Sequence, residues 1–219
     1  MPADIYSSRR TDYRRHVYQI ALEQFSLTYI KKLIGKRCYL APCGQGDAEL
    51  WAKWENDLEV AIPLGDEAYF PGTVEKSRAR IDSIIASNGQ VFNIILLEKD
   101  QPIGRCMLFN IDHINRNAVL GIMIGEKNYW DQGYGEETIR LLVDYGFNLL
   151  NLNNILLGTF SFNQRGIRCY EKIGFKTIGR RRGARIIGNK KYDILLMDLL
   201  ADEFKSELIP AFLPDETVP

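Results

Sequence analysis

The pattern of apolar and polar positions predicts strands and helices in alternation along the second half of the chain. The run AVLGIMIG, residues 118–125, is apolar at nearly every position and predicts a buried strand. Residues 138–150 carry apolar side chains at helical spacing and predict a long amphipathic helix. Beyond it we expect a strand at 154–158, a short helix at 163–172, and strands at 175–179 and 191–199 around an arginine-rich loop.

The first half of the chain combines neighbouring strands with helices. Its predicted strands are KRCYLAP (36–42), VFNIILLE (91–98) and PIGRCMLFNI (102–111), and its predicted helices are DAELWAKWEN (47–56) and residues 73–87. The two halves together predict one α/β domain (α+β in some schemes) with a mixed, mostly antiparallel sheet flanked by helices. We expect this domain at residues 34–200, after an N-terminal helical extension at 1–33 and before a C-terminal tail at 201–219, either docked or loose.

The segment between the apolar strand and the long helix is NYWDQGYGEE, from Asn128 to Glu137. Gly133 and Gly135 allow a sharp turn and leave its backbone N–H groups uncovered. These groups lie at the start of a helix, where four donors lack helical partners and the helix dipole is positive. The segment therefore predicts a turn that binds a phosphate or pyrophosphate.

The composition is that of a globular protein, with 46% hydrophobic and 26% charged residues. No apolar run reaches membrane-spanning length, and the start MPADIYSSRR lacks the apolar stretch of a secretion signal, so we expect a cytoplasmic protein without a membrane partner. The cysteines Cys38, Cys43, Cys106 and Cys169 form no CxxC pair. Buried free thiols are therefore expected, and no metal site.

The net charge is zero, which argues against a protein built mainly to bind nucleic acid. The charge is uneven, because residues 1–37 and 180–191 are rich in Lys and Arg and residues 55–75 are rich in Asp and Glu. Solvated faces explain most such clusters, and we expect the arginines at 180–185 to form a solvated hairpin.

A second informative segment is SFNQRGIRCYEKIGF, from Ser161 to Phe175. Asn163 opens the predicted short helix, and Tyr170 follows seven residues later, near the same helix face. Gly174 predicts the end of this helix. Taken alone, Asn163 is equally well explained as a helix cap and Tyr170 as a core tyrosine.

In combination these motifs resemble the GNAT superfamily of acetyl-coenzyme A-dependent N-acetyltransferases. The resemblance covers about residues 34–199, and IGKRCYLAP, DAELWAKWENDLEV and GIMIGEKNYWDQGYGEE are similar to the branch of ribosomal-protein N-terminal and spermidine acetyltransferases. It implies a single GNAT-like domain with acetyl-CoA as cosubstrate. Trp130 departs from the Arg or Gln of the superfamily's phosphate-turn pattern, although tryptophan is common in this branch.

The resemblance also implies the site residues. The backbone amides of Gln132, Gly133, Tyr134, Gly135 and Glu136 would hold the pyrophosphate, and the strand residues Ile122, Met123 and Ile124 would pair with pantetheine. Tyr170 matches the tyrosine that protonates the leaving thiolate, and Asn163 matches a position that fixes the cofactor arm or a water. Because carboxylates would repel phosphate, we predict that the side chains of Glu136 and Glu137 point elsewhere.

Several other side chains have open roles. An amine that titrates near pH ~10 needs a proton acceptor, and the unassigned candidates are Glu55, Asp57, Asp112, His113 and Glu126. Arg165, Arg168 and Lys172 either meet the 3′-phosphate of coenzyme A or form an ordinary basic helix face. Trp51 and Trp54 are expected to pack inward, with a role in substrate shape as the alternative.

We therefore hypothesise an N-acetyltransferase that moves acetyl from acetyl-CoA to a primary amine, such as a protein N-terminus, a polyamine or another small amine. The acidic residues at 55–75 favour a cationic acceptor. The alternative is a catalytically weak scaffold that binds coenzyme A and acts as a sensor or partner-docking module. A homodimer through an edge strand or the added helix is a further expectation.

Overall fold

The structure is a computed structural model that describes residues 29–206 and 208–212. The predicted helical extension at 1–33 lies outside the described residues except for its last five. Residues 29–32 have no helical structure, and Leu33 already belongs to the first strand. The boundary expected after residue 33 therefore falls within this strand, and the helix itself stays a prediction.

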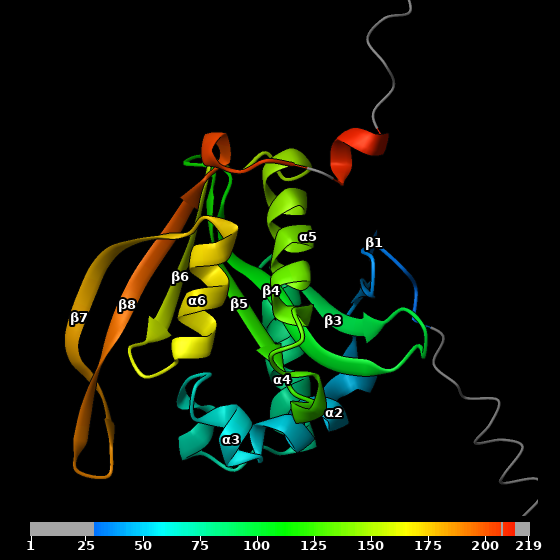
Figure 1. Cartoon of the computed structure of the whole chain (residues 1–219). Coiled ribbons are helices and arrows are strands. Elements are labelled where there is room, and N and C mark those ends of the chain that lie inside the picture. The colour runs from blue at the N-terminus through cyan, green and yellow to red at the C-terminus, as the bar shows by residue number, and fades with distance from the viewer. Residues whose placement is uncertain (1–28, 207, 213–219) are drawn as a thin grey trace, which may run out of the picture.

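In the described part of the chain, eight strands form one mixed sheet in the order β1-β2-β3-β4-β5-β6-β8-β7 (Figure 1). They are β1 (Leu33–Ile34), β2 (Cys38–Pro42), β3 (Gln90–Leu96), β4 (Pro102–Asp112), β5 (Asn117–Ile124), β6 (Asn154–Phe160), β7 (Lys176–Ile187) and β8 (Lys190–Leu200). Neighbouring strands are antiparallel except β5 and β6, which run parallel. The predicted mixed, mostly antiparallel sheet is confirmed.

Helices cover both faces of this sheet (Figure 1). One face carries α5 (Tyr134–Asn148) and α6 (Gln164–Ile173), and the other carries α2 (Ala48–Glu55), α3 (Leu58–Ala61) and α4 (Val74–Ala86). Short 3-10 turns are η1 (Gln45–Asp47), η2 (Asp66–Tyr69), η3 (Lys127–Tyr129), η4 (Ala201–Glu203) and η5 (Ile209–Phe212). Among the described helices, none combines the length and apolar character needed to cross a bilayer.

Each face of the sheet has its own apolar core. Under α5, Ile139 and Leu142 pack with buried strand side chains. On the other face, Trp51 and Trp54 of α2 pack against Ile81 of α4, and both tryptophans are buried. Fully burying one large apolar side chain contributes about 1.5–3 kcal/mol, so these residues hold α2 to the sheet. The predicted inward packing of the two tryptophans is confirmed.

Side-chain caps fix the ends of two predicted helices. The Thr73 hydroxyl accepts a hydrogen bond from the Lys76 amide at 3.3 Å, so α4 starts next to it. The Asn163 side chain accepts from the Gly166 amide at 3.1 Å and caps α6. At the other end of α6, Gly174 has a φ of 120°, a conformation that favours glycine. The predicted start and stop of α6 are confirmed.

Two elements differ from the sequence prediction. Helix α5 begins at Tyr134, four residues before the expected start, because Gly133 in the left-handed region (φ 83°) serves as its N-cap. The arginine-rich run at 180–185 is part of strand β7, which continues to Ile187 and turns back at Gly188. The expected loop is wrong, since Arg180, Arg181 and Arg185 pair with β8 across a register shift.

The described part of the C-terminal tail is docked on α5. Asp144 of α5 accepts hydrogen bonds from the Ser206 hydroxyl at 2.7 Å and from the Leu208 amide at 2.9 Å. The Phe204 ring packs on Phe147 with centroids 5.9 Å apart. Of the two alternatives for the tail, docking therefore holds for these residues.

Candidate active site

The site begins where two parallel strands separate. β5 and β6 pair only from Asn117 to Val119 on β5 and from Asn154 to Leu156 on β6. β5 continues to pair with β4 as far as Ile124, so from residue 120 onward its other backbone edge has no strand partner among the described strands. Unpaired strand groups are hydrogen-bonding sites for an extended partner. The open edge of β5 can therefore hold an extended ligand.

A cleft of about 300 Å³ lies at this separation. Its lining includes nine predicted site residues, namely Ile122, Met123, Ile124, Gly133, Tyr134, Gly135, Glu136, Asn163 and Tyr170. Val60, Pro63 and Leu64 form an apolar opposite wall. Gln132 is outside the lining, because its carbonyl faces Arg37 and its side-chain amide donates to the Asn128 carbonyl at 2.6 Å. The structure thus brings together all predicted site residues except Gln132.

The turn ahead of α5 presents bare backbone N–H groups. Asp131 and Gly133 have positive φ values of 56° and 83°, which produce the sharp reversal. Within the described residues, no backbone acceptor is found for the amides of residues 132–136. The Trp130 indole donates to the Ile124 carbonyl at 2.8 Å and so fastens the turn to the end of β5. This geometry suits an anion at the start of α5.

The two glutamates of the first helical turn are held by cations. Glu137 accepts hydrogen bonds from the Arg37 side chain at 2.9 Å and the Arg37 amide at 2.7 Å, on the side away from the cleft. Glu136 lines the cleft but pairs with Lys172 at 2.5 Å and with Arg140 at 3.2 Å. The prediction that both carboxylates point away from the cleft therefore holds for Glu137. Glu136 lines the cleft, where Lys172 and Arg140 neutralise its charge.

Tyr170 lies half-buried in the cleft wall, with its ring edge against Phe175 at a centroid distance of 6.1 Å. Burial, with a smaller contribution from Cys169, raises the pKa of Tyr170 well above its ordinary value. The phenol is therefore protonated at neutral pH. No hydrogen bond ties its hydroxyl to another described residue, which leaves it available to a ligand.

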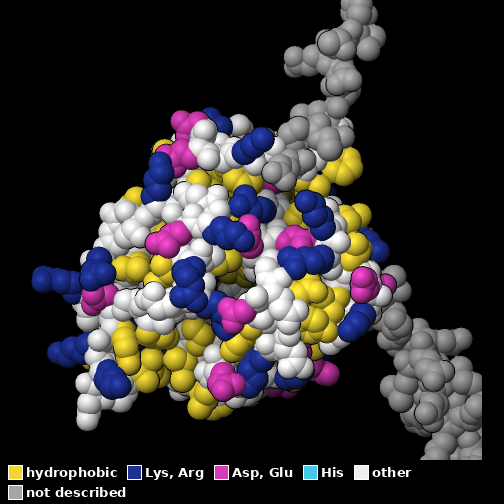
Figure 2. All heavy atoms as spheres, viewed as in Figure 1, with side chains coloured by type: hydrophobic (Ala, Val, Ile, Leu, Met, Phe, Trp, Pro, Cys, Tyr) yellow, Lys and Arg dark blue, Asp and Glu magenta, His cyan; other side chains and the backbone are white. Residues whose placement is uncertain are grey.

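Basic side chains of α6 surround the same cleft. Arg165, Arg168 and Lys172 all line it. The Arg165 guanidinium stacks 3.7 Å from the centre of the Trp130 ring, and partial burial lowers its pKa. Figure 2 shows Lys and Arg side chains around the middle of this face, interspersed with Asp and Glu. The cations on this face can therefore contact an anionic ligand, and some of them also form ion pairs with carboxylates of the protein.

The five candidates for a general base all lie outside the described lining of the cleft: Glu55, Asp57, Asp112, His113 and Glu126. Glu126 accepts from Lys53 at 2.5 Å and from the Trp54 indole at 2.8 Å, and although partial burial opposes it, these bonds lower its pKa. Asp112 caps the β4–β5 connector and pairs in register with Asn117, at the end of β5 remote from the cleft. The structure gives these two carboxylates structural roles.

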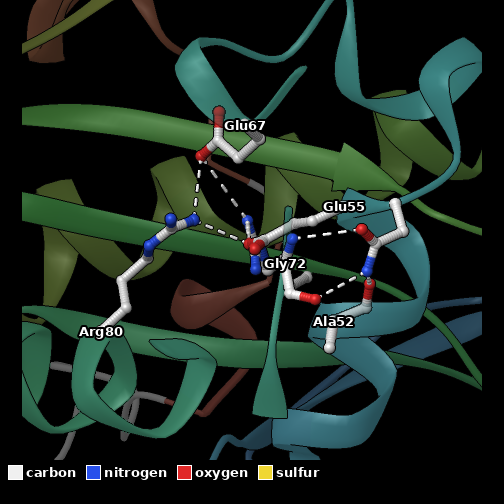
Figure 3. Close-up of polar contacts among 7 residues, drawn as sticks. Ala52, Glu55, Glu67, Gly72 and Arg80 are labelled. Carbon is white, nitrogen blue, oxygen red and sulfur yellow. Dashed lines mark hydrogen bonds and ion pairs between the residues drawn. The ribbon is translucent and has the colours of Figure 1, made fainter. Parts of the chain in front are cut away.

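An ion cluster joins four side chains from α2, α4, β4 and η2, and two of them, Glu55 and Arg105, are buried (Figure 3). Glu55 of α2 pairs with Arg105 of β4 at 2.8 Å and with Arg80 of α4 at 2.7 Å. Arg80 also reaches Glu67 at 3.1 Å. Arg105 and Glu55 are 2% and 4% exposed, so each needs the charge of the other. The cluster fixes residues 57–72, hereafter the 57–72 wall, to the sheet.

Strand β7 holds the 57–72 wall from its other side. The buried Arg185 pairs with Asp66 at 3.1 Å, donates to the Gly65 carbonyl, and stacks on Tyr69 at 4.2 Å. The Tyr69 hydroxyl donates to the Ile186 carbonyl at 2.7 Å. The expectation of a solvated hairpin is therefore wrong for Arg185, which is 4% exposed.

Most of the acidic residues in the 55–75 stretch are neutralised. Glu55 and Glu67 belong to the ion cluster, Asp66 pairs with Arg185, and Lys127 holds Asp57 and Glu59. Of the acidic residues at 55–75, Glu75 alone has no ion pair to a described residue. The stretch is thus not a free negative surface, and its charge gives little support to the expected cationic acceptor.

Among the described residues, neither the cysteines nor other potential metal-binding side chains form a second site. All four cysteines are free thiols; Cys38, Cys43 and Cys106 are buried, and Cys169 is half-buried in the cleft lining. Over residues 29–206 and 208–212, no group of three or more His, Cys, Asp or Glu side chains is placed to hold a metal ion. Sequence reasoning missed Arg37, Arg105 and Arg185, whose partners are remote in the chain and leave no local signal.

Residues 37–176 match the family described as the acetyltransferase (GNAT) domain. The chain is 28% identical over 160 residues to uncharacterized N-acetyltransferase p20 of Bacillus licheniformis, covering 72% of this chain and 89% of that protein. It is also 28% identical over 104 residues to spermidine N(1)-acetyltransferase of Escherichia coli K12, covering 48% of this chain and 55% of that protein.

Among solved structures, the fold resembles spermidine N-acetyltransferase of Vibrio cholerae, crystallised with CoA and spermine. The TM-score is 0.69 at 23% identity, and the match covers 76% of this chain and 97% of that one. At this identity the likeness concerns the fold.

Proposed function

The chain belongs to the acetyltransferase (GNAT) family and is an N-acetyltransferase with acetyl-CoA as its cosubstrate, and we propose that it acetylates a primary amine with Tyr170 as the general acid. The observation that carries the proposal is the cleft at the separation of β5 and β6, which unites the open edge of β5, the bare amides of the turn, and Tyr170.

The donor would lie along β5 with its diphosphate at the start of α5. The amides of Gly133, Tyr134 and Gly135 would bind the diphosphate, and the unpaired edge at Ile122 would pair with the pantetheine arm. Asn163, whose side chain already caps α6, would position the arm from the start of that helix. We call this region, β5 with residues 128–137, the donor side.

Transfer from a thioester mainly requires positioning and proton management, because the thioester is already an activated acyl group. The amine nitrogen forms a bond to the acetyl carbon, the carbon–sulfur bond breaks, and the sulfur takes the proton of Tyr170. The raised pKa of Tyr170 keeps that proton in place until sulfur accepts it. Since none of the five candidate bases belongs to the described lining of the cleft, the amine would lose its proton to water, and water would return a proton to the Tyr170 phenolate.

The acceptor would enter against the 57–72 wall, which we call the acceptor side. Its apolar lining by Val60, Pro63 and Leu64 suits an alkyl chain that ends in an amine. Relatives named spermidine acetyltransferases support a polyamine as the first acceptor to test. A peptide N-terminus and a short alkylamine are the alternatives.

Isothermal titration with acetyl-CoA followed by a thiol-release assay tests the proposal. We expect binding in the micromolar range and thiol release that depends on one of spermidine, a peptide with a free N-terminus, or a short alkylamine. Failure to bind acetyl-CoA at submillimolar concentration would remove the proposal. Binding without release for any amine would instead favour a scaffold that retains coenzyme A without catalysis.

A further inference from the structure

The β1–β2 turn reaches across to the turn ahead of α5. Arg37 is 95 residues before Gln132 in the chain, yet its Nη1 donates to the Gln132 carbonyl at 2.5 Å. Its Nε donates to Glu137 at 2.9 Å, and its guanidinium stacks 4.8 Å from the centre of the Tyr134 ring. One side chain therefore contacts three positions in and beside the proposed diphosphate-binding turn.

Glu137 completes this contact from the helix side. Besides the Arg37 side chain, its carboxylate accepts the backbone N–H groups of Arg37 at 2.7 Å and Cys38 at 3.3 Å. The approach leaves no room at Gly35, where an added Cβ would lie 2.4 Å from a Glu137 oxygen. Gly35, Arg37 and Glu137 form one unit, which we call the turn anchor.

The bond to Gln132 determines which way one peptide group points. In a trans peptide, the Gln132 carbonyl and the Gly133 N–H point in opposite directions. Arg37 holds the carbonyl on its own side, so the N–H faces the other side. Gly133 is flexible enough to let the peptide rotate if the carbonyl is released. A rotated peptide would present an oxygen to the diphosphate where an N–H is needed.

We propose that Arg37 and Glu137 are positioning residues that hold residues 132–136 in the shape that binds the diphosphate of the donor. This inference rests on the proposed function, because it concerns the residues that hold the proposed diphosphate-binding turn in shape. Arg37 acts through the turn, because it lines a separate hollow of about 520 Å³ on the far side and is absent from the lining of the 300 Å³ cleft.

Glu137→Gln separates positioning from simple charge attraction. This change keeps the Arg37 charge and removes a negative one, so a role through charge alone predicts tighter binding of the anionic donor. Positioning predicts weaker binding, because the amide holds Arg37 and the β1–β2 turn less firmly. Arg37→Lys adds a second comparison, since lysine keeps the charge without the two-pronged contact to Gln132 and Glu137.

The experiment measures coenzyme A affinity by titration calorimetry and steady-state kinetics for Arg37→Ala, Arg37→Lys and Glu137→Gln. We expect Arg37→Ala to raise the Kd for coenzyme A and the KM for acetyl-CoA about tenfold, the usual loss for a charge-assisted hydrogen bond. The kcat and the KM for the amine should stay unchanged. Glu137→Gln and Arg37→Lys should weaken binding by smaller factors.

Lys176→Ala is the matched control, because it breaks an exposed ion pair with Glu203 outside the turn anchor. Hydrogen exchange of the Glu137 amide, which donates to the Gly133 carbonyl at 3.1 Å, gives a second readout without ligand, and it should be faster in Arg37→Ala than in the control. Unchanged exchange, or tighter coenzyme A binding by Glu137→Gln, would overturn the inference. If the wild-type protein bound no coenzyme A but the exchange difference appeared, the proposed function would fail while the anchoring contact stood.

Discussion

The donor side of the cleft is built from backbone groups, whereas the acceptor side is built from paired side chains. At the donor side, amides 132–136 have no backbone acceptor among the described residues. At the acceptor side, Glu55, Arg80, Arg105 and Glu67 form ion pairs with one another, and Arg185 holds the loop from β7. The donor side therefore keeps backbone N–H groups available to a ligand, whereas the charged side chains of the acceptor side form ion pairs within the protein.

This difference indicates where selectivity lies. A turn of backbone amides recognises any diphosphate of suitable shape, so the donor side suits a common cosubstrate. The acceptor side is a loop whose position depends on ion pairs from α2, α4, β4 and β7. A change in those pairs would reshape the acceptor side without touching the donor turn, and the following predictions test that separation.

The largest effect is expected at Tyr170, where the two sides meet. Tyr170→Phe removes the proposed proton donor and should lower kcat about 10²–10⁴-fold with little change in the KM for acetyl-CoA. Because burial holds the tyrosine pKa high, the wild-type rate should not decline through Tyr170 ionisation near pH 8. Tyr145→Phe is the control, since its hydroxyl bonds Gln90 at 3.1 Å outside the cleft. Equal kcat values for Tyr170→Phe and wild type would refute the assignment.

The next effect is a loss of stability at the acceptor side. Glu55→Gln leaves the buried Arg105 with only the more distant Glu67 carboxylate at 3.9 Å, and breaking a buried pair from one side costs about 3–5 kcal/mol. Urea unfolding should show this loss, and the KM for the amine should rise while coenzyme A affinity stays constant. Glu75→Gln, at an exposed carboxylate, should change stability very little. A loss of coenzyme A affinity in folded Glu55→Gln would contradict the separation of the two sides.

A smaller effect is expected within the donor turn. Gly133→Ala places a side chain at φ 83° and its Cβ 2.9 Å from the Arg37 guanidinium, a strain of about 1–2 kcal/mol. The KM for acetyl-CoA should rise about tenfold, equivalent to about 1.4 kcal/mol, with the amine KM unchanged. Gly135→Ala is the control for folding, because the nearest atom to its Cβ is 3.9 Å away. Equal unfolding free energies for the two variants would argue against strain at Gly133.

The smallest effect is the pH dependence of the turn anchor. Partial burial opposes ionisation of Glu137, but hydrogen bonds from Arg37 and Cys38 outweigh it and hold its pKa below the ordinary 4.5. A lowered pKa stabilises the fold above the unfolded value, and that contribution is lost as the pH falls through the folded value. The stability difference between wild type and Glu137→Gln should therefore shrink as the pH drops below about 4.5. A constant difference down to pH 3 would show that the charge of Glu137 contributes nothing.

The features readable from the sequence were those encoded by neighbouring residues. The glycine turn, the Asn163 cap and the strand 118–125 each have a local physical cause, and the structure places them at one cleft. The apolar pattern predicts the start of α5 too late, because its first turn carries the polar residues Glu136 and Glu137. The catalytic and binding roles themselves stay predictions.

The features that escaped prediction depend on residues far apart in the chain. Arg37 and Glu137 are separated by 100 residues, and Arg185 and Asp66 by 119. Judged from its sequence neighbours, each of these residues looks like an ordinary surface charge, because its partner comes close only in the folded protein. The run at 180–185 contains the turn-like Gly183 and many arginines, which suggested a loop where bulged pairing extends β7.

Cys169 has a chemical consequence for a protein that handles a thioester. Its sulfur lines the cleft, 3.9 Å from where a Cβ of Gly135 would lie. Burial, followed by the charge of Glu136, raises the pKa of Cys169 to about 11. Because thiolates rather than thiols attack acyl groups and disulfides, this sulfur is a poor nucleophile at neutral pH. With the donor bound as proposed, Cys169 is therefore expected to stay a free thiol and not to accept the acetyl group.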